Sequence, residues 1–112
     1  MNKKELATFI QYDEYELLEL FQDEPVSVGD DVCAGILMYV YEDNNNFKLV
    51  FTLDVYRKVC TISITYKDYS VFDGEFLNIT EIHKRERDLI IRIKGMEKVK
   101  IKFFKQLGVE LL

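Results

Sequence analysis

Residues 98–103 read Lys-Val-Lys-Ile-Lys-Phe, a strict alternation of basic and apolar side chains. Because successive side chains of a β-strand point to opposite faces, the alternation predicts a strand at 98–104 with a buried apolar face and a cationic face toward water. Residues 88–94 form the preceding predicted strand, and Gly95-Met96-Glu97 forms the turn between the two. The chain is therefore expected to carry a basic β-hairpin at 88–104.

The expected register of this hairpin brings like charges together. When the apolar faces of its two strands are aligned, two pairs of basic side chains lie opposite each other, and each such pair costs roughly 0.2–1 kcal/mol. Three sources of compensating negative charge remain open: acidic residues of the chain itself, an acidic protein partner, or the phosphates of a nucleic acid. The basic pairs are Lys94 with Lys98 and Arg92 with Lys100, beside the apolar pairs Ile93–Val99, Ile91–Ile101 and Leu89–Phe103.

Charge is divided between two parts of the chain. Residues 1–31 hold nine acidic and two basic residues, a net of −7, whereas residues 83–105 hold nine basic and three acidic residues, a net of +6. The formal charge of all 112 residues is −5, which disfavours general binding to nucleic acid or to anionic membranes, although the local reversal at 83–105 weakens that argument. The acidic part is either a solvated helix face or a surface for a basic partner, because complementary fields speed association.

The rest of the pattern predicts an α+β fold. Residues 2–22 show a helical apolar stripe that is interrupted at Asp13, where Asp-x-x-Glu resembles a helix start, so two short helices or one kinked helix are expected. The expected architecture is a single domain, 1–112, with this N-terminal helix packed on an antiparallel sheet of about six strands in meander order. Strands are predicted at 32–41, 47–56, 59–66, 76–82, 88–94 and 98–104, a short edge strand at 107–112, and turns at 67–70 and 72–74.

The two cysteines are expected to be free thiols. In a meander with tight turns, Cys33 and Cys60 both lie opposite Val55, on either side of the strand at 47–56. Two strand spacings amount to about 9–10 Å, which exceeds the reach of a disulfide. The sequence has no apolar run long enough to span a membrane, and no cleavage site follows its first residues, so we expect a cytoplasmic protein.

No motif for catalysis or for a cofactor is present. The single histidine, His83, has no cysteine or histidine at metal-ligand spacing, and Asp30-Asp31 lacks the ligand spacing of a calcium loop. Neither a nucleophile elbow nor a phosphate-binding glycine loop occurs. We therefore expect no cofactor, no metal and no enzyme activity, with a carboxylate-based hydrolase as the open alternative.

The second half of the chain resembles the small bacterial immunity proteins of polymorphic-toxin systems. The resemblance rests on Phe72-Asp73-Gly74, on the alternating residues 98–103 and on Gly108-Val109-Glu110, as parts of a succession of short strands. It implies a protein that binds and inhibits a toxin. Small phage-encoded inhibitors of host defence nucleases have a similar size and acidity, and they imply an anti-defence role.

Together these observations favour a small acidic inhibitor that blocks a basic enzyme, such as a nuclease, by occupying its charged groove. The expected charge partners are Asp13, Glu16, Glu19, Asp23, Glu24, Asp30 and Asp31. One alternative is a nucleic-acid-binding domain, and another is a self-associating accessory protein. The nucleic-acid alternative uses the basic hairpin 87–105 through Arg87, Arg92, Lys94, Lys98, Lys100 and Lys102.

Overall fold

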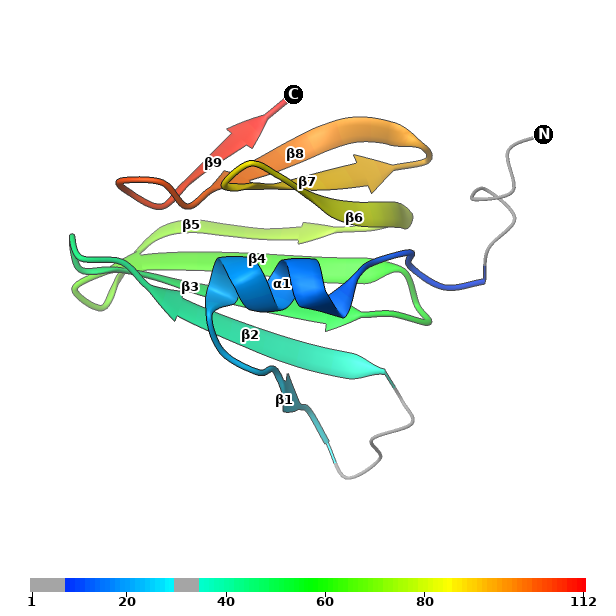
Figure 1. Ribbon diagram of the computed structural model, residues 1–112, viewed down its shortest axis with the longest axis horizontal. Coiled ribbons are helices and arrows are strands. Elements are labelled where there is room, and N and C mark those ends of the chain that lie inside the picture. Colours follow the sequence, from blue (N-terminus) through cyan, green and yellow to red (C-terminus); the bar gives the residue numbers. More distant parts are fainter. Residues whose placement is uncertain (1–7, 30–34) are drawn as a thin grey trace.

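The computed structural model describes residues 8–29 and 35–112, and it consists of one helix and two antiparallel sheets (Figure 1). The first sheet has the strand order β1-β2-β3-β4-β5, and the second has the order β6-β7-β8-β9. The elements are α1 (Glu14–Phe21), β1 (Val26–Ser27), β2 (Ile36–Glu42), β3 (Phe47–Asp54), β4 (Val59–Tyr66), β5 (Tyr69–Phe76), β6 (Ile79–Arg85), β7 (Asp88–Ile93), β8 (Met96–Lys102) and β9 (Gly108–Leu111).

The prediction of a helix packed on antiparallel strands in meander order is confirmed, whereas the prediction of about six strands in one sheet is wrong. The strands divide into a sheet of five and a sheet of four. The division falls at Leu77 and Asn78, inside the strand predicted at 76–82, where Asn78 adopts a positive φ of 59°. Phe76 therefore ends β5 and Ile79 begins β6.

The turn predicted at 67–70 is present at Lys67-Asp68, whereas the bend predicted at 72–74 is replaced by strand β5. A tight turn at Lys67-Asp68, both with positive φ, leads directly into this edge strand. Gly74, at which the sequence predicts a bend, lies inside β5. An added Cβ there would come within 3.1 Å of the Phe76 ring, so the packing of that ring favours glycine. The short strand β1 was also not predicted; it pairs Val26 with Met38 in β2.

The helix begins where the sequence indicated, at Asp13, whose carboxylate accepts a hydrogen bond of 2.8 Å from the Tyr15 amide. The predicted helix at 2–22 is nevertheless wrong for residues 8–12, which are the residues before Asp13 that the structure describes. Ile10 donates its amide to the Val55 carbonyl, and Gln11 forms a parallel bridge with Glu81 on β6. Backbone hydrogen bonds to both sheets hold this segment in an extended conformation. A short helix is only marginally stable by itself, so the helical conformation cannot compete with these hydrogen bonds.

One core joins the helix to both sheets. Phe21 at the end of α1 has its ring centroid 4.9 Å from that of Tyr39 on β2, 5.9 Å from that of Phe51 on β3 and 5.2 Å from that of Phe103 after β8. Figure 1 shows α1 lying across the face of β2, β3 and β4. The core residues of sheet and helix are fully or nearly fully buried, and they form one continuous cluster.

The predicted register of the last hairpin is wrong by three residues next to the turn and by two residues beyond the bulge. The turn consists of Lys94 and Gly95, with φ values of 51° and 81°, and a bulge lies between Ile91 and Arg92. Two-residue turns with two positive φ values match the twist of antiparallel strands. The observed pairs are Ile93–Met96, Arg92–Glu97, Ile91–Val99, Ile90–Lys100 and Leu89–Ile101, so neither like-charge pair forms.

The register around the cysteines also differs from the prediction. Cys60 lies opposite Leu53 rather than Val55, and its thiol is free and buried. The predicted strand at 32–41 begins in the structure at Ile36, and Cys33 lies outside the described residues.

Candidate functional site

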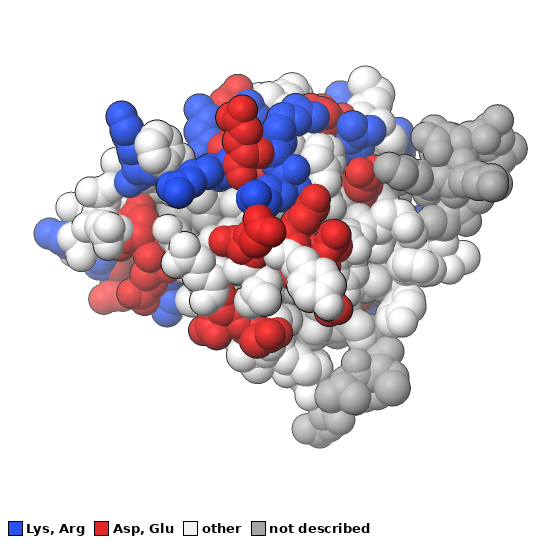
Figure 2. Space-filling view, viewed as in Figure 1, with Lys and Arg blue, Asp and Glu red and all other residues white. Residues whose placement is uncertain are grey.

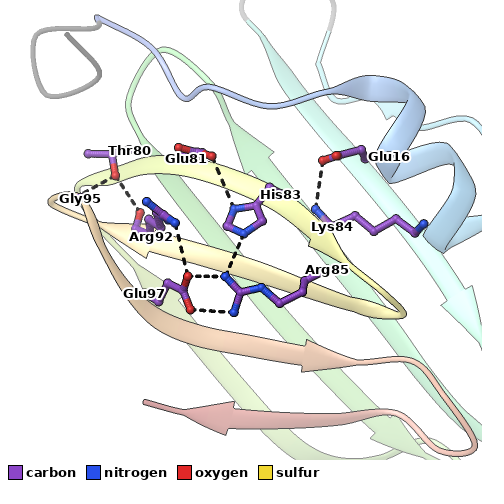
Figure 3. A network of polar contacts seen from close by, with 9 residues as sticks. All are labelled: Glu16, Thr80, Glu81, His83, Lys84, Arg85, Arg92, Gly95 and Glu97. Atoms are coloured by element: carbon purple, nitrogen blue, oxygen red, sulfur yellow. Dashed lines mark hydrogen bonds and ion pairs between the residues drawn. The ribbon is translucent and has the colours of Figure 1, made fainter. Parts of the chain in front are cut away.

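Acidic residues of the second sheet neutralise part of the basic hairpin. Glu97 accepts hydrogen bonds from the Arg85 guanidinium, and its Oε2 lies 3.3 Å from Nη2 of Arg92 (Figure 3). Lys102 forms a second ion pair, at 3.0 Å, with Glu110 on β9. The hydrogen bond from Arg85 lowers the pKa of the Glu97 carboxyl, and the hydrogen bond from Lys102 lowers that of Glu110.

Lys84 is the contact between the acidic helix and the basic sheet. Its Nζ lies 2.8 Å from Oε2 of Glu19, and its backbone amide donates to Oε1 of Glu16 at 3.0 Å. Figure 3 shows Glu16 extending from α1 toward β6. Two of the expected charge partners, Glu16 and Glu19, are therefore engaged within the protein.

His83 takes part in a polar network on the outer face of β6 and β7. Its Nδ1 lies 3.5 Å from Oε1 of Glu81, and its Nε2 lies 3.5 Å from Nη2 of Arg85. Thr80 extends the network, since its hydroxyl donates to the Arg92 carbonyl and accepts from the Gly95 amide. The Thr80 contacts link β6 to β7, whereas Glu81 and Arg85 lie on the same strand as His83, so the contacts of His83 join side chains along β6.

The remaining candidate cations are distributed over separate parts of the surface. The guanidinium of Arg87 lies 5.3 Å from the ring centroid of Phe104, a side chain that is 58% exposed. Nζ of Lys105 lies 5.7 Å from the same centroid. Within residues 8–29 and 35–112, four candidate cations form no ion pair: Arg87, Lys94, Lys98 and Lys100.

The acidic side chains near α1 are only partly engaged within the protein. Asp13 caps the helix, and Asp23 accepts a hydrogen bond from the Glu24 amide. The carboxylates of Glu14 and Glu24 form no ion pair or hydrogen bond with any described side chain. Figure 2 shows acidic side chains over α1 and below it, and basic side chains over the sheet of β6–β9. The last two expected charge partners, Asp30 and Asp31, lie outside the described residues.

A hollow of about 440 Å³ opens between α1 and β2, beside these free carboxylates. We call it the tyrosine hollow. Apolar and phenolic side chains form its walls, and no basic residue of the described chain lines it. Its lining residues are Tyr12, Glu14, Tyr15, Leu18, Glu24, Pro25, Leu37 and Tyr39.

Glu14 lines the tyrosine hollow but is absent from the charge partners that the sequence predicts. Glu14 and Leu18 are four residues apart, which places them on one face of the helix, and this spacing was the available signal. Glu24 was predicted and does line the hollow. The hollow itself depends on Tyr39, which comes from β2 and which no local pattern connects with the helix.

Neither a membrane-spanning helix nor a metal centre occurs in the part of the chain that the structure describes. The only helix there, α1, has eight residues, too few to cross a bilayer. No three histidine, cysteine or acidic side chains within 8–29 and 35–112 are close enough together to hold a metal ion.

The fold has a counterpart among solved structures. It is similar to a chain of a contact-dependent growth inhibition toxin–immunity protein complex from Klebsiella pneumoniae 342, with a TM-score of 0.74 and 13% sequence identity. The similarity covers 93% of this chain and 96% of that chain. No protein-family model and no curated protein matches the sequence. This protein therefore shares its fold, over nearly its whole length, with a chain of a toxin–immunity protein complex.

Proposed function

We propose that this protein is an immunity protein, a non-catalytic chain that binds a toxin domain and blocks its activity. The observation that carries the proposal is the shared fold, with a TM-score of 0.74 over 93% of the chain. Such a complex contains a toxin and an immunity protein, and the charge distribution of this chain favours the role of the immunity protein.

Electrostatics supports the choice of an inhibitor. Glu97 and Glu110 pair with basic side chains of the second sheet, whereas Glu14 and Glu24 beside α1 have no described cationic partner. With a formal charge of −5, the exposed negative field on the helix side attracts a basic protein. A toxin that acts on nucleic acid has such a basic groove, so we propose a nuclease as the target and occupation of its groove as the mechanism.

The proposal is tested by growth and by co-purification. Each candidate toxin domain from the source genome is expressed alone, with this protein, and with an unrelated acidic protein of similar size as a control. Growth arrest by the toxin alone, recovery only with this protein, and a complex that dissociates in high salt are expected. Growth arrest caused by this protein alone, or a lack of both rescue and complex, would contradict the immunity role.

A second candidate function, nucleic-acid binding, is favoured by one observation. Phe104 is an exposed ring flanked by Arg87 and Lys105, an arrangement on which a base can stack while the cations contact phosphate. A gel shift with single-stranded RNA at low salt tests it. Binding that weakens steeply with added salt would support this candidate, and no shift at concentrations on the order of tens of micromolar would remove it.

A further inference from the structure

The chemistry of the tyrosine hollow indicates what it binds. Two carboxylates, Glu14 and Glu24, stand at a cavity whose other walls are tyrosine rings and apolar side chains. Such a cavity combines negative charge with surfaces that can contact an aliphatic stem and a flat cation. Since none of the lining side chains is basic, the described part of the chain supplies no counter-ion there.

Tyr39 provides a second observation that points to a ligand in the tyrosine hollow. Its side chain is only 2% exposed, and no described residue forms a hydrogen bond with its hydroxyl. Burial raises the pKa of this phenol, and the charges of Tyr12, Glu14 and Glu24 raise it further. Because these three residues all line the hollow, the hydroxyl end of the ring faces it. The hydroxyl oxygen is not among the enclosed polar atoms that lack a partner, so it remains accessible at the hollow and is open to a hydrogen-bond donor from a ligand.

We infer that the tyrosine hollow receives an arginine side chain of the basic toxin, with the guanidinium between Glu14 and Glu24 and within reach of the Tyr39 hydroxyl. This inference rests on the proposed immunity function. Arginine fits better than lysine because its planar guanidinium offers several donors in a fixed geometry and stacks on aromatic rings. Arginine side chains held in desolvated, aromatic-lined pockets are frequent anchors of protein interfaces.

The first test uses this protein alone. The full chain is titrated with N-acetyl-arginine amide while backbone amide NMR signals are followed, and N-acetyl-lysine amide and N-acetyl-norleucine amide serve as comparators. We expect saturable shifts at Leu18, Leu37 and Tyr39 with a dissociation constant in the millimolar range, weaker binding of lysine, and none of norleucine. Absence of saturation, shifts centred elsewhere, or equal binding of the lysine derivative would overturn the inference.

The second test uses the complex with the toxin. We expect the double variant Glu14→Gln/Glu24→Gln to bind the toxin about tenfold more weakly, because charge-assisted hydrogen bonds are lost. Tyr39→Phe should also weaken binding and leave the fold intact, because its ring contacts with Phe21 and Phe51 remain. Glu75→Gln is the matched control, since Glu75 is exposed on β5 and has no ion pair with a described residue.

The two proposals fail in different ways. If a complex forms and all of these variants bind as tightly as Glu75→Gln, the tyrosine hollow is not the anchor, and the immunity function stands. If no complex forms with the unaltered protein, the immunity function falls, and the titration with the arginine derivative alone decides whether the hollow binds a guanidinium.

Discussion

Arg92 on β7 lies directly opposite Glu97 on β8, and their side chains form an ion pair at 3.3 Å. The pairing exists because the bulge after Ile91 and the turn at Lys94-Gly95 shift the register from the one that apolar alignment predicts. A second cation, Arg85 from β6, joins the same carboxylate. The outer face of the second sheet is therefore a mixed-charge network in which these two arginines already have a partner.

The Glu97 carboxylate should contribute to stability in a pH-dependent way. Its pKa is lowered in the folded protein from the ordinary value of 4.5, first by the hydrogen bond from Arg85. A lowered pKa contributes stability above the ordinary pKa, and that contribution is lost as pH falls through the lowered value. We expect Glu97→Gln to lower the urea midpoint at pH 7 and to approach the wild-type midpoint under acid conditions.

Glu75→Gln is the control for this measurement, since Glu75 is an exposed residue of β5 without an ion pair among the described residues. Equal midpoints of Glu97→Gln and Glu75→Gln at pH 7 would show that the network around Glu97 adds nothing to stability.

Ile90 should behave as a core residue although it lies on the charged face of the second sheet. It is fully buried, and its cross-strand neighbours are His83 and Lys100, whose ring and aliphatic stem can cover an apolar side chain. We expect Ile90→Ala to reduce the free energy of unfolding by about 2–5 kcal/mol in chemical denaturation. Val40→Ala, at a partly exposed position of β2, should cost about 0.5 kcal/mol or less, and a similar small cost at Ile90 would contradict the prediction.

The turn at Lys94-Gly95 offers a stabilising substitution. Both residues have positive φ, a conformation that asparagine tolerates better than lysine and that glycine adopts freely. We expect Lys94→Asn to raise the free energy of unfolding by about 0.5 kcal/mol. Gly95→Ala should lower it by about 1 kcal/mol because a Cβ is strained at this φ. A lower melting temperature for Lys94→Asn together with a higher one for Gly95→Ala would show that the turn type is different.

The Cys60 thiol should be inert in the folded protein. Burial raises its pKa from the ordinary value of 9.0 to about 12, so almost no thiolate exists at pH 8. In a Cys33→Ser variant, where Cys60 is the only thiol, we expect labelling by a disulfide reagent only after unfolding in denaturant. Labelling of the native protein as fast as that of the unfolded chain would mean that the strand pair β3–β4 opens easily.

Local patterns predicted most of the individual elements. The alternating residues of β3, β4 and β8 have a period of two, and each pattern lies within one strand, so neighbouring residues alone indicate it. Asp13 marked the helix start correctly because a cap contacts the amide only two residues away. The strand β5 was missed because an exposed edge strand needs little apolar alternation.

Features that depend on distant residues were not predictable in the same way. The hairpin register followed from the position of the turn at Lys94-Gly95 and from a bulge, which inserts one residue and leaves no pattern in the sequence. The extended segment at Ile10 and Gln11 is held by carbonyls of residues 55 and 80. Its helical apolar spacing was therefore overruled by long-range backbone hydrogen bonds.

The sequence by itself determined the kind of fold, a helix before antiparallel strands, and the division into acidic and basic parts, because both depend on the order of residue types along the chain. Only the tertiary structure decided which charges remain free, since Glu97, Glu110 and Glu19 meet their cations across strands or from helix to sheet. It also formed the tyrosine hollow, where Glu14 and Glu24 meet Tyr39. A binding site of this kind depends on distances in space, and those arise only when separate elements pack on one core.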